Sequence, residues 1–135
     1  MRTPAFALSS ILFVAIASGC GGDSAANTAR TLSIPDIQGA GSTSPFVDQE
    51  VTVHGIVTGD FQDGDDDDAR NLGGFYIQDA GDDDPATSDG IFIFDGNRVS
   101  PDVKPGDRVR VSGTVTEHFD ETQIIASSVT TVGSG

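Results

Sequence analysis

The chain has 135 residues, a formal net charge of −14 and only 36% hydrophobic residues. This length leaves room for one small domain and excludes a large two-domain enzyme. The 17 glycines, 6 prolines and lack of tryptophan argue against a long-helix bundle or coiled coil and favour a turn-rich β domain. The acid excess opposes the basic surface that usually binds polyphosphates, so any nucleic-acid role has to be argued against the charge.

The N-terminus has the pattern of an export signal. Arg2 precedes an apolar run over residues 5–17, and small residues follow before Cys20. This run is too short for a transmembrane helix, whereas a basic start, a short apolar run and a small-residue exit are typical of a secretory signal peptide. The exit ASGC, residues 17–20, resembles the lipobox of bacterial lipoproteins. That resemblance implies a signal peptide over residues 1–19 and lipidation of Cys20.

Export and lipidation together predict the location and the layout of the chain. We expect a lipoprotein of the cell envelope, held at the outer membrane or cell surface by its lipid alone. Cys20 is the only cysteine, so an intramolecular disulfide is excluded. Residues 20–32 are largely small and polar and predict a flexible tether. The domain itself is expected over residues 33–132, with a short tail over 133–135.

Alternating apolar and polar residues predict five strands, over residues 49–58, 73–79, 90–95, 108–117 and 122–132. Gly55 and Gly113 fall inside strands, where a small barrel must bend sharply. A turn with Pro and Gly over residues 104–107 starts the fourth strand. Together these features predict an all-β, five-stranded OB-fold-like Greek-key barrel. Pro101 and Pro105 interrupt the segment between the third and fourth strands, so we expect the OB helix there to be vestigial or absent.

Several motifs in a fixed order carry a more specific resemblance. They are IPDIQG (34–39), VTVHGIVTGDFQ (51–62), GGFYIQD (73–79), GDDDPATSDGIFIF (81–94) and KPGDRVRVSGTVTEHFDETQI (104–124). In these motifs the chain resembles the OB-type domain at the N-terminus of large bacterial extracellular nucleases. In that family a metal-dependent endonuclease/exonuclease/phosphatase domain follows and supplies the catalytic residues.

A catalytic domain of that type needs more residues than this whole chain has. The resemblance therefore implies a non-catalytic accessory module rather than an enzyme. Its partner would be a nuclease catalytic domain or another surface protein. His54 and His118 lie far apart in the sequence with no third ligand identifiable beside them, and neither a nucleophile elbow nor a phosphate-binding P-loop motif is present.

Candidate nucleic-acid contacts fall on the predicted strands and in the turn before the fourth strand. Tyr76 and Phe92 are candidate stacking platforms for the bases of single-stranded DNA or RNA, and Lys104, Arg108 and Arg110 are candidate phosphate contacts. The two arginines should point outward, because the alternating valines of that strand point inward. A second interpretation stays open, in which these residues are ordinary core aromatics and surface charges. The polyanionic loop over residues 59–72 would repel phosphate.

Acidic residues are concentrated between residues 60 and 89, which hold 11 of the 21 carboxylates. Asp63, Asp65 and Asp67 have the spacing that opens an EF-hand, but the glycine and glutamate that such a loop requires are missing. A looser Ca²⁺ site is predicted from four other aspartates, Asp79, Asp82, Asp84 and Asp89. The chain could then be an acidic Ca²⁺-binding structural or protein-docking module with no nucleic-acid role. The alternative is a solvated acidic loop that keeps the protein soluble.

Overall fold

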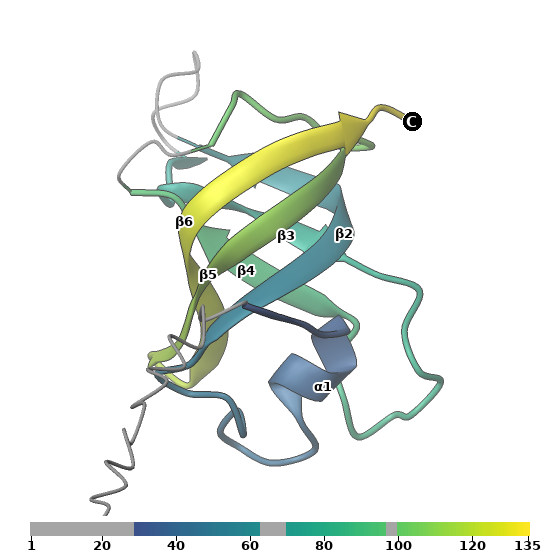
Figure 1. Cartoon of the computed structure of the whole chain (residues 1–135), viewed down its shortest axis with the longest axis vertical. Helices are drawn as coiled ribbons and strands as arrows, with labels where there is room; N and C mark the ends of the chain where they lie inside the picture. Colours follow the sequence, from purple (N-terminus) through teal and green to yellow (C-terminus); the bar gives the residue numbers. More distant parts are fainter. Residues whose placement is uncertain (1–28, 63–69, 97–99) are drawn as a thin grey trace, which may run out of the picture.

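The computed structural model describes residues 29–62, 70–96 and 100–135, and the strands within them wind into a single barrel (Figure 1). In chain order the elements are β1 (Arg30–Thr31), α1 (Ile34–Gln38), β2 (Glu50–Phe61), β3 (Gly74–Gln78), β4 (Gly90–Phe94), β5 (Arg108–His118) and β6 (Glu121–Gly133). The predicted signal peptide, Cys20 and the first acidic cluster, Asp63, Asp65 and Asp67, lie outside the described residues.

The strand order has the connectivity of an OB-fold. Across the sheet the order is β1-β2-β3-β4-β6-β5, and β5 pairs back with β2 to close the barrel. The barrel pairs are antiparallel except for β4 and β6, which run parallel. The prediction of an all-β, five-stranded OB-type Greek-key barrel is therefore confirmed.

Strand β1 is an addition to the predicted set. Its two residues, Arg30 and Thr31, pair in parallel with Val51 and Thr52 of β2. The backbone N–H of Leu32 continues this pairing by donating to the carbonyl of Thr52, over 2.9 Å. The ordered domain therefore begins inside the segment over residues 20–32 that was predicted to be a tether.

Barrel closure depends on the long strand β2, which has different partners along its two halves. Residues 50–56 pair with β5, and residues 56–61 pair with β3. Gly55 lies close to this changeover, and a Cβ there would come within 2.9 Å of the carbonyl oxygen of Gln78. A Cβ on Gly113 would collide with the carbonyl oxygen of Ile125. The register also shifts next to Gly113 in β5, as expected where a strand bends.

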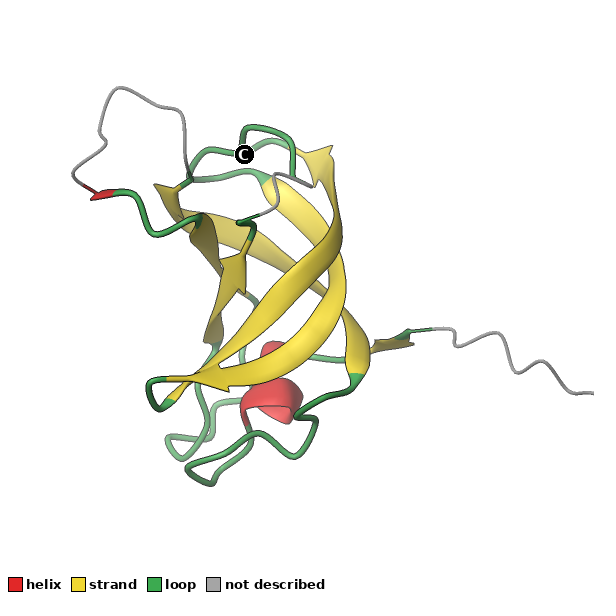
Figure 2. Cartoon of the chain, turned by 90° about the vertical axis from the view of Figure 1, so that its left-hand side faces the viewer, coloured by secondary structure: helices red, strands yellow, loops and turns green. Residues whose placement is uncertain are grey.

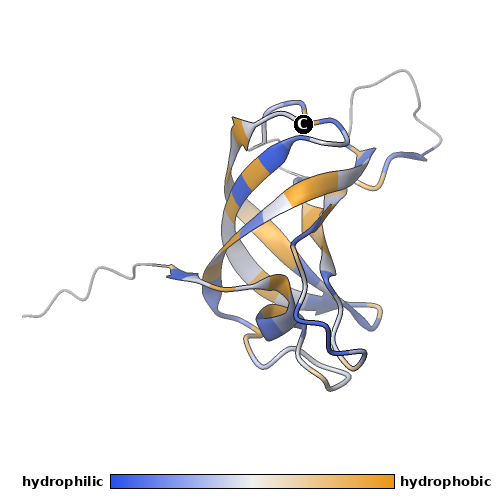
Figure 3. Cartoon of the chain, turned by 90° about the vertical axis from the view of Figure 1, so that its right-hand side faces the viewer, coloured by the Kyte–Doolittle hydropathy of each residue, from blue (hydrophilic) through white to orange (hydrophobic). Residues whose placement is uncertain are grey.

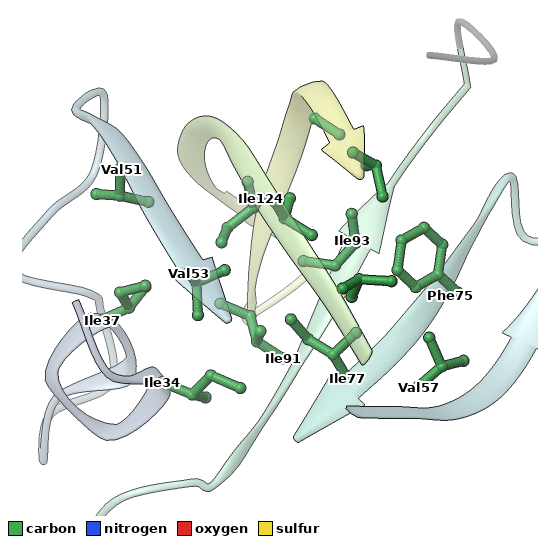
Figure 4. Close-up of a cluster of buried hydrophobic side chains, with 14 of the residues drawn as sticks. Ile34, Ile37, Val51, Val53, Val57, Phe75, Ile77, Ile91, Ile93 and Ile124 are labelled. Carbon is green, nitrogen blue, oxygen red and sulfur yellow. The ribbon is translucent and has the colours of Figure 1, made fainter. Parts of the chain in front are cut away.

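The barrel interior includes the three valines of β5 that the alternation predicted to point inward, Val109, Val111 and Val115. Orange and blue residues alternate along the strands, which shows this pattern directly (Figure 3). Figure 4 shows the core extending from Ile34 and Ile37 at one end to Phe75 and Val57 at the other. The buried cluster comprises Ile34, Ile37, Val51, Val53, Val57, Phe75, Ile77, Ile91, Ile93, Val103, Val109, Val111, Val115, Ile124, Ala126 and Val129.

A short helix covers one end of the barrel (Figure 2). Helix α1 starts after Ser33, whose hydroxyl accepts the backbone N–H of Asp36, and ends at Gly39 with a φ of +67°. Its residues Ile34 and Ile37 are fully buried in the core. The sequence predicted no helix here, because five residues are too few to show a helical period. No helix in the described ranges is long and apolar enough to cross a membrane.

Replacing Gly113 by alanine should destabilise the barrel, because the new methyl group would meet the backbone of β6. We expect Gly113→Ala to lower the free energy of unfolding by about 1 to 3 kcal/mol in urea titrations. Gly41→Ala is the matched control, since nothing lies closer than 3.8 Å to the position of its added Cβ. Equal stability of the two variants would contradict the tight crossing at Gly113.

Candidate functional site

The outer face of β3, β4 and β6 carries a row of aligned side chains. Tyr76 lies between the inward residues Phe75 and Ile77 and therefore points outward. It pairs with Phe92 of β4, and Phe92 in turn pairs with Gln123 of β6. Because directly paired residues share one face of a sheet, the three side chains cross the barrel surface side by side.

Three aromatic rings meet on this face. The ring centroids of Tyr76 and Phe92 are 4.8 Å apart, with 55° between their planes. The ring of Phe61, at the end of β2, meets Tyr76 edge-on at 6.0 Å. Both distances lie within the range of attractive aromatic pairs. Phe92 is only 6% exposed and forms the floor, while Tyr76 stays partly accessible above it.

The rings of Tyr76 and Phe92 form part of a groove of about 380 Å³ on the barrel surface, and Phe61 lies against Tyr76 outside its lining. Leu72 and Ile125, which are 54% and 41% exposed, add apolar surface to it. In OB-folds this face, together with the loop between the last two strands, is the usual place of the ligand. The groove is lined by Leu72, Tyr76, Phe92, Phe94, His118, Glu121, Gln123 and Ile125.

The hydroxyl of Tyr76 is anchored to the edge of the groove. It donates a hydrogen bond of 2.8 Å to Oε1 of Glu121, at the start of β6. Partial burial raises the pKa of Tyr76, and the hydrogen bond to Glu121 and its negative charge raise it further. The phenol therefore stays protonated at neutral pH and continues to donate to Glu121, which fixes the direction of the ring.

The predicted basic contacts do not join the aromatic residues. Arg110 pairs with His54 of β2, and Arg108 pairs with Ile56, so both arginines lie along the β2–β5 seam. Arg108, His54 and Ile56 line a separate groove of about 360 Å³. Lys104 is exposed in the turn before β5, as predicted. The aromatic and basic candidates therefore lie on different strands of the barrel, because closure places β5 beside β2 and β6 rather than beside β3 and β4.

Asp79 has a structural role. One carboxylate oxygen accepts the backbone N–H of Ile34 at 2.7 Å, and the other accepts that of Gly81 at 2.8 Å. The side chain thereby ties the end of β3 to the first residue of α1. A half-buried carboxylate whose two oxygens both accept hydrogen bonds stabilises the end of the barrel that α1 covers.

The other predicted calcium ligands form local turns. Asp82 accepts the backbone N–H of Asp84, and Asp84 accepts that of Ala86, at 3.0 and 2.9 Å. Asp89 is exposed at the end of the same loop. Within residues 29–62, 70–96 and 100–135, no three His, Cys, Asp or Glu side chains gather closely enough to hold a metal ion. The four aspartates are therefore not brought together in this structure, and calcium binding by them stays a prediction.

Several residues of this face were not predicted from the sequence. Phe61 lies three residues beyond the predicted end of the first strand, since β2 continues to that residue. Ile125 is apolar yet points outward, where the alternation expects a polar residue, and this break in the pattern was an available signal. Glu121 was not among the candidate contacts identified from the sequence. Its bond to Tyr76 depends on the pairing of strands far apart in the sequence.

Comparisons with known proteins add little to this description. No family model and no curated protein matches the chain. Among solved structures, the hypothetical protein YgiW from E. coli is similar, with a TM-score of 0.45 and 19% identity over 64% of this chain and 77% of that one. The assignment of the fold therefore rests on the strand order and register given above.

Titration of the phenol tests the contact between Tyr76 and Glu121. Tyr76 is the only tyrosine and tryptophan is absent, so absorbance of the phenolate reports this residue alone. We expect a midpoint above the ordinary pKa of 10.0. Because the folded-state pKa is raised, the stabilisation is fully present below about pH 10 and is lost as the pH rises through the folded-state value.

Glu121→Gln should move that midpoint towards 10.0, because it removes the charge but keeps an oxygen acceptor. Asp120→Asn is the matched control. It removes the neighbouring carboxylate, whereas the Tyr76 hydroxyl donates its hydrogen bond to Glu121. Identical midpoints in the native protein and in Glu121→Gln would show that the carboxylate does not act on the phenol.

Proposed function

We propose that the chain is a non-catalytic binding module that holds single-stranded nucleic acid in the groove on β3, β4 and β6. The observation that carries the proposal is the tilted pair of Tyr76 and Phe92, with Phe61 edge-on to Tyr76, on the face where OB-folds take their ligands. The resemblance to the OB-type domain of extracellular nucleases supports the same ligand class.

Stacking supplies the binding energy in this proposal. A base placed on an aromatic side chain contributes about 1 to 3 kcal/mol and does so for any base, because every base has a π face. Leu72 and Ile125 add apolar surface on either side of the rings. The lining residues include no lysine or arginine in the part of the chain that the structure describes. Binding should therefore be weak and tolerant of sequence.

The charge of the chain sets an unusual salt dependence. Proteins that neutralise phosphates lose affinity steeply as salt rises, because counterions are released on binding. Here the net charge is −14, and the arginines lie on another side of the barrel. Salt instead screens the repulsion between two anions. Affinity should stay constant or increase between about 50 and 200 mM salt.

The cellular setting belongs to the same proposal and depends on the sequence alone. Export, lipidation of Cys20 and the nuclease resemblance together describe an envelope lipoprotein that presents nucleic acid to a separate nuclease domain. Cys20→Ala should then shift the protein from the membrane fraction to the soluble fraction of the envelope. Fractionation followed by immunoblotting measures this, and unchanged membrane association would contradict lipid anchoring at that residue.

The binding test uses the full chain and about 15 nucleotides of oligo-dT or oligo-U. Quenching of the fluorescence of Tyr76, the only tyrosine, reports a base stacked at this ring. We expect saturable quenching that salt does not weaken. In an anisotropy assay with labelled oligonucleotide, Tyr76→Leu should lower the affinity about tenfold. A parallel titration with about 2 mM Ca²⁺ tests whether the predicted aspartate site contributes.

Arg108→Ala with Arg110→Ala is the matched control, because these side chains lie along the β2–β5 seam. This double variant should bind within about twofold of the native chain. If it loses binding while Tyr76→Leu does not, the ligand site is the basic seam and the proposed groove is wrong. If no condition gives saturable binding, the nucleic-acid function is wrong, and an acidic protein-docking module becomes the better account.

A further inference from the structure

The turn between β5 and β6 contains a bulky residue in an unfavourable backbone conformation. His118 pairs with Glu121, which leaves Phe119 and Asp120 as a two-residue turn. Their φ angles are +48° and +63°. Positive φ at both positions is the pattern of a type I′ hairpin, which strongly favours Asn or Gly. A bulky residue such as phenylalanine is a conformational outlier there.

Burial in the core does not compensate for this strain. The side chain of Phe119 is 92% exposed and does not belong to the buried core. Its ring contacts the neighbouring His118, with 4.5 Å between the centroids. A large exposed apolar side chain that also strains the backbone gives the free protein no evident benefit. Strain of this kind is concentrated at sites that bind ligands.

The position of Phe119 connects it to the groove. His118 and Glu121, the residues that flank the turn, both line the aromatic groove. Asp120 and Glu121 also line a wider groove of about 560 Å³, which includes Tyr76 and Gly90. The turn therefore lies at the edge of both grooves, and the exposed Phe119 stands between residues that line them.

We propose that Phe119 is a second stacking residue, which holds a base of the bound single strand next to the one on Tyr76. This inference rests on the proposed function. Stacking by the ring accounts for a phenylalanine at a position that favours Asn or Gly. Two partly separate rings, one on a stiff strand and one at a hairpin tip, would hold a single strand at two points without any phosphate contact.

The test separates folding from binding because the two should change in opposite directions. Phe119→Asn places a residue that tolerates positive φ in the turn and removes the ring. We expect the unfolding temperature of the full chain to rise by about 4 °C. We expect its affinity for labelled oligo-dT to fall about tenfold. Phe119→Tyr keeps a ring and should bind within about twofold of the native chain.

Val132→Asn is the matched control, since Val132 is also an exposed apolar residue, 57% accessible, but lines the groove that contains Arg108. It should leave the affinity unchanged. If the native chain binds and Phe119→Asn binds equally well, the role of Phe119 is wrong and the groove proposal stands. If Phe119→Tyr loses binding, stacking at this position is also wrong. If the native chain itself does not bind, the proposed function fails first.

Discussion

The pairing of β2 with two different strands is the constraint on which this structure depends. Its first half belongs to the ladder with β5 and its second half to the ladder with β3. The strand can pair with both partners only by bending. Gly55 lies where a Cβ atom would come too close to the backbone carbonyl of Gln78 in β3. Closing the sheet in this way removes the free edges of the barrel strands and encloses a core that a flat sheet of this size could not bury.

Closure also decides which side chains share a surface. Tyr76 and Phe92 lie together because β3 and β4 are direct neighbours, and Glu121 joins them because β6 pairs with β4. Arg110 lies on β5, beside His54. The barrel thereby separates its aromatic groove from its arginines, so a ligand on the rings meets an apolar surface with a carboxylate at the edge. This separation is why contact with bases suits the groove better than contact with phosphates.

Along β5, alternation was enough to predict which side of the strand faces the core. Val109 and Val111 point inward and Arg110 outward, as the pattern requires. Alternation carries no information on the position of a strand around the barrel, which depends on pairing between distant segments. The separation of the arginines from the aromatic residues could therefore not be predicted from the pattern. Helix α1 was not predicted, because Ile34 and Ile37 show only a single helical spacing. The hydrogen bond from the Ile34 backbone to Asp79 joins residues far apart in the sequence, so the sequence pattern could not predict it.

The divided pairing of β2 has a consequence for how the chain reaches its native state. During synthesis or export from the N-terminus, β2 emerges well before β5, the partner that completes the barrel. Local contacts such as the tight β5–β6 hairpin form quickly, whereas pairing Val53 with Val111 requires closing a long loop first. Until then β2 keeps an edge open to other chains. Aggregation should therefore compete with folding mainly before β5 has docked. If the whole chain were released unfolded at once, this interval would be shorter, because β5 would be available to pair as soon as β2 is.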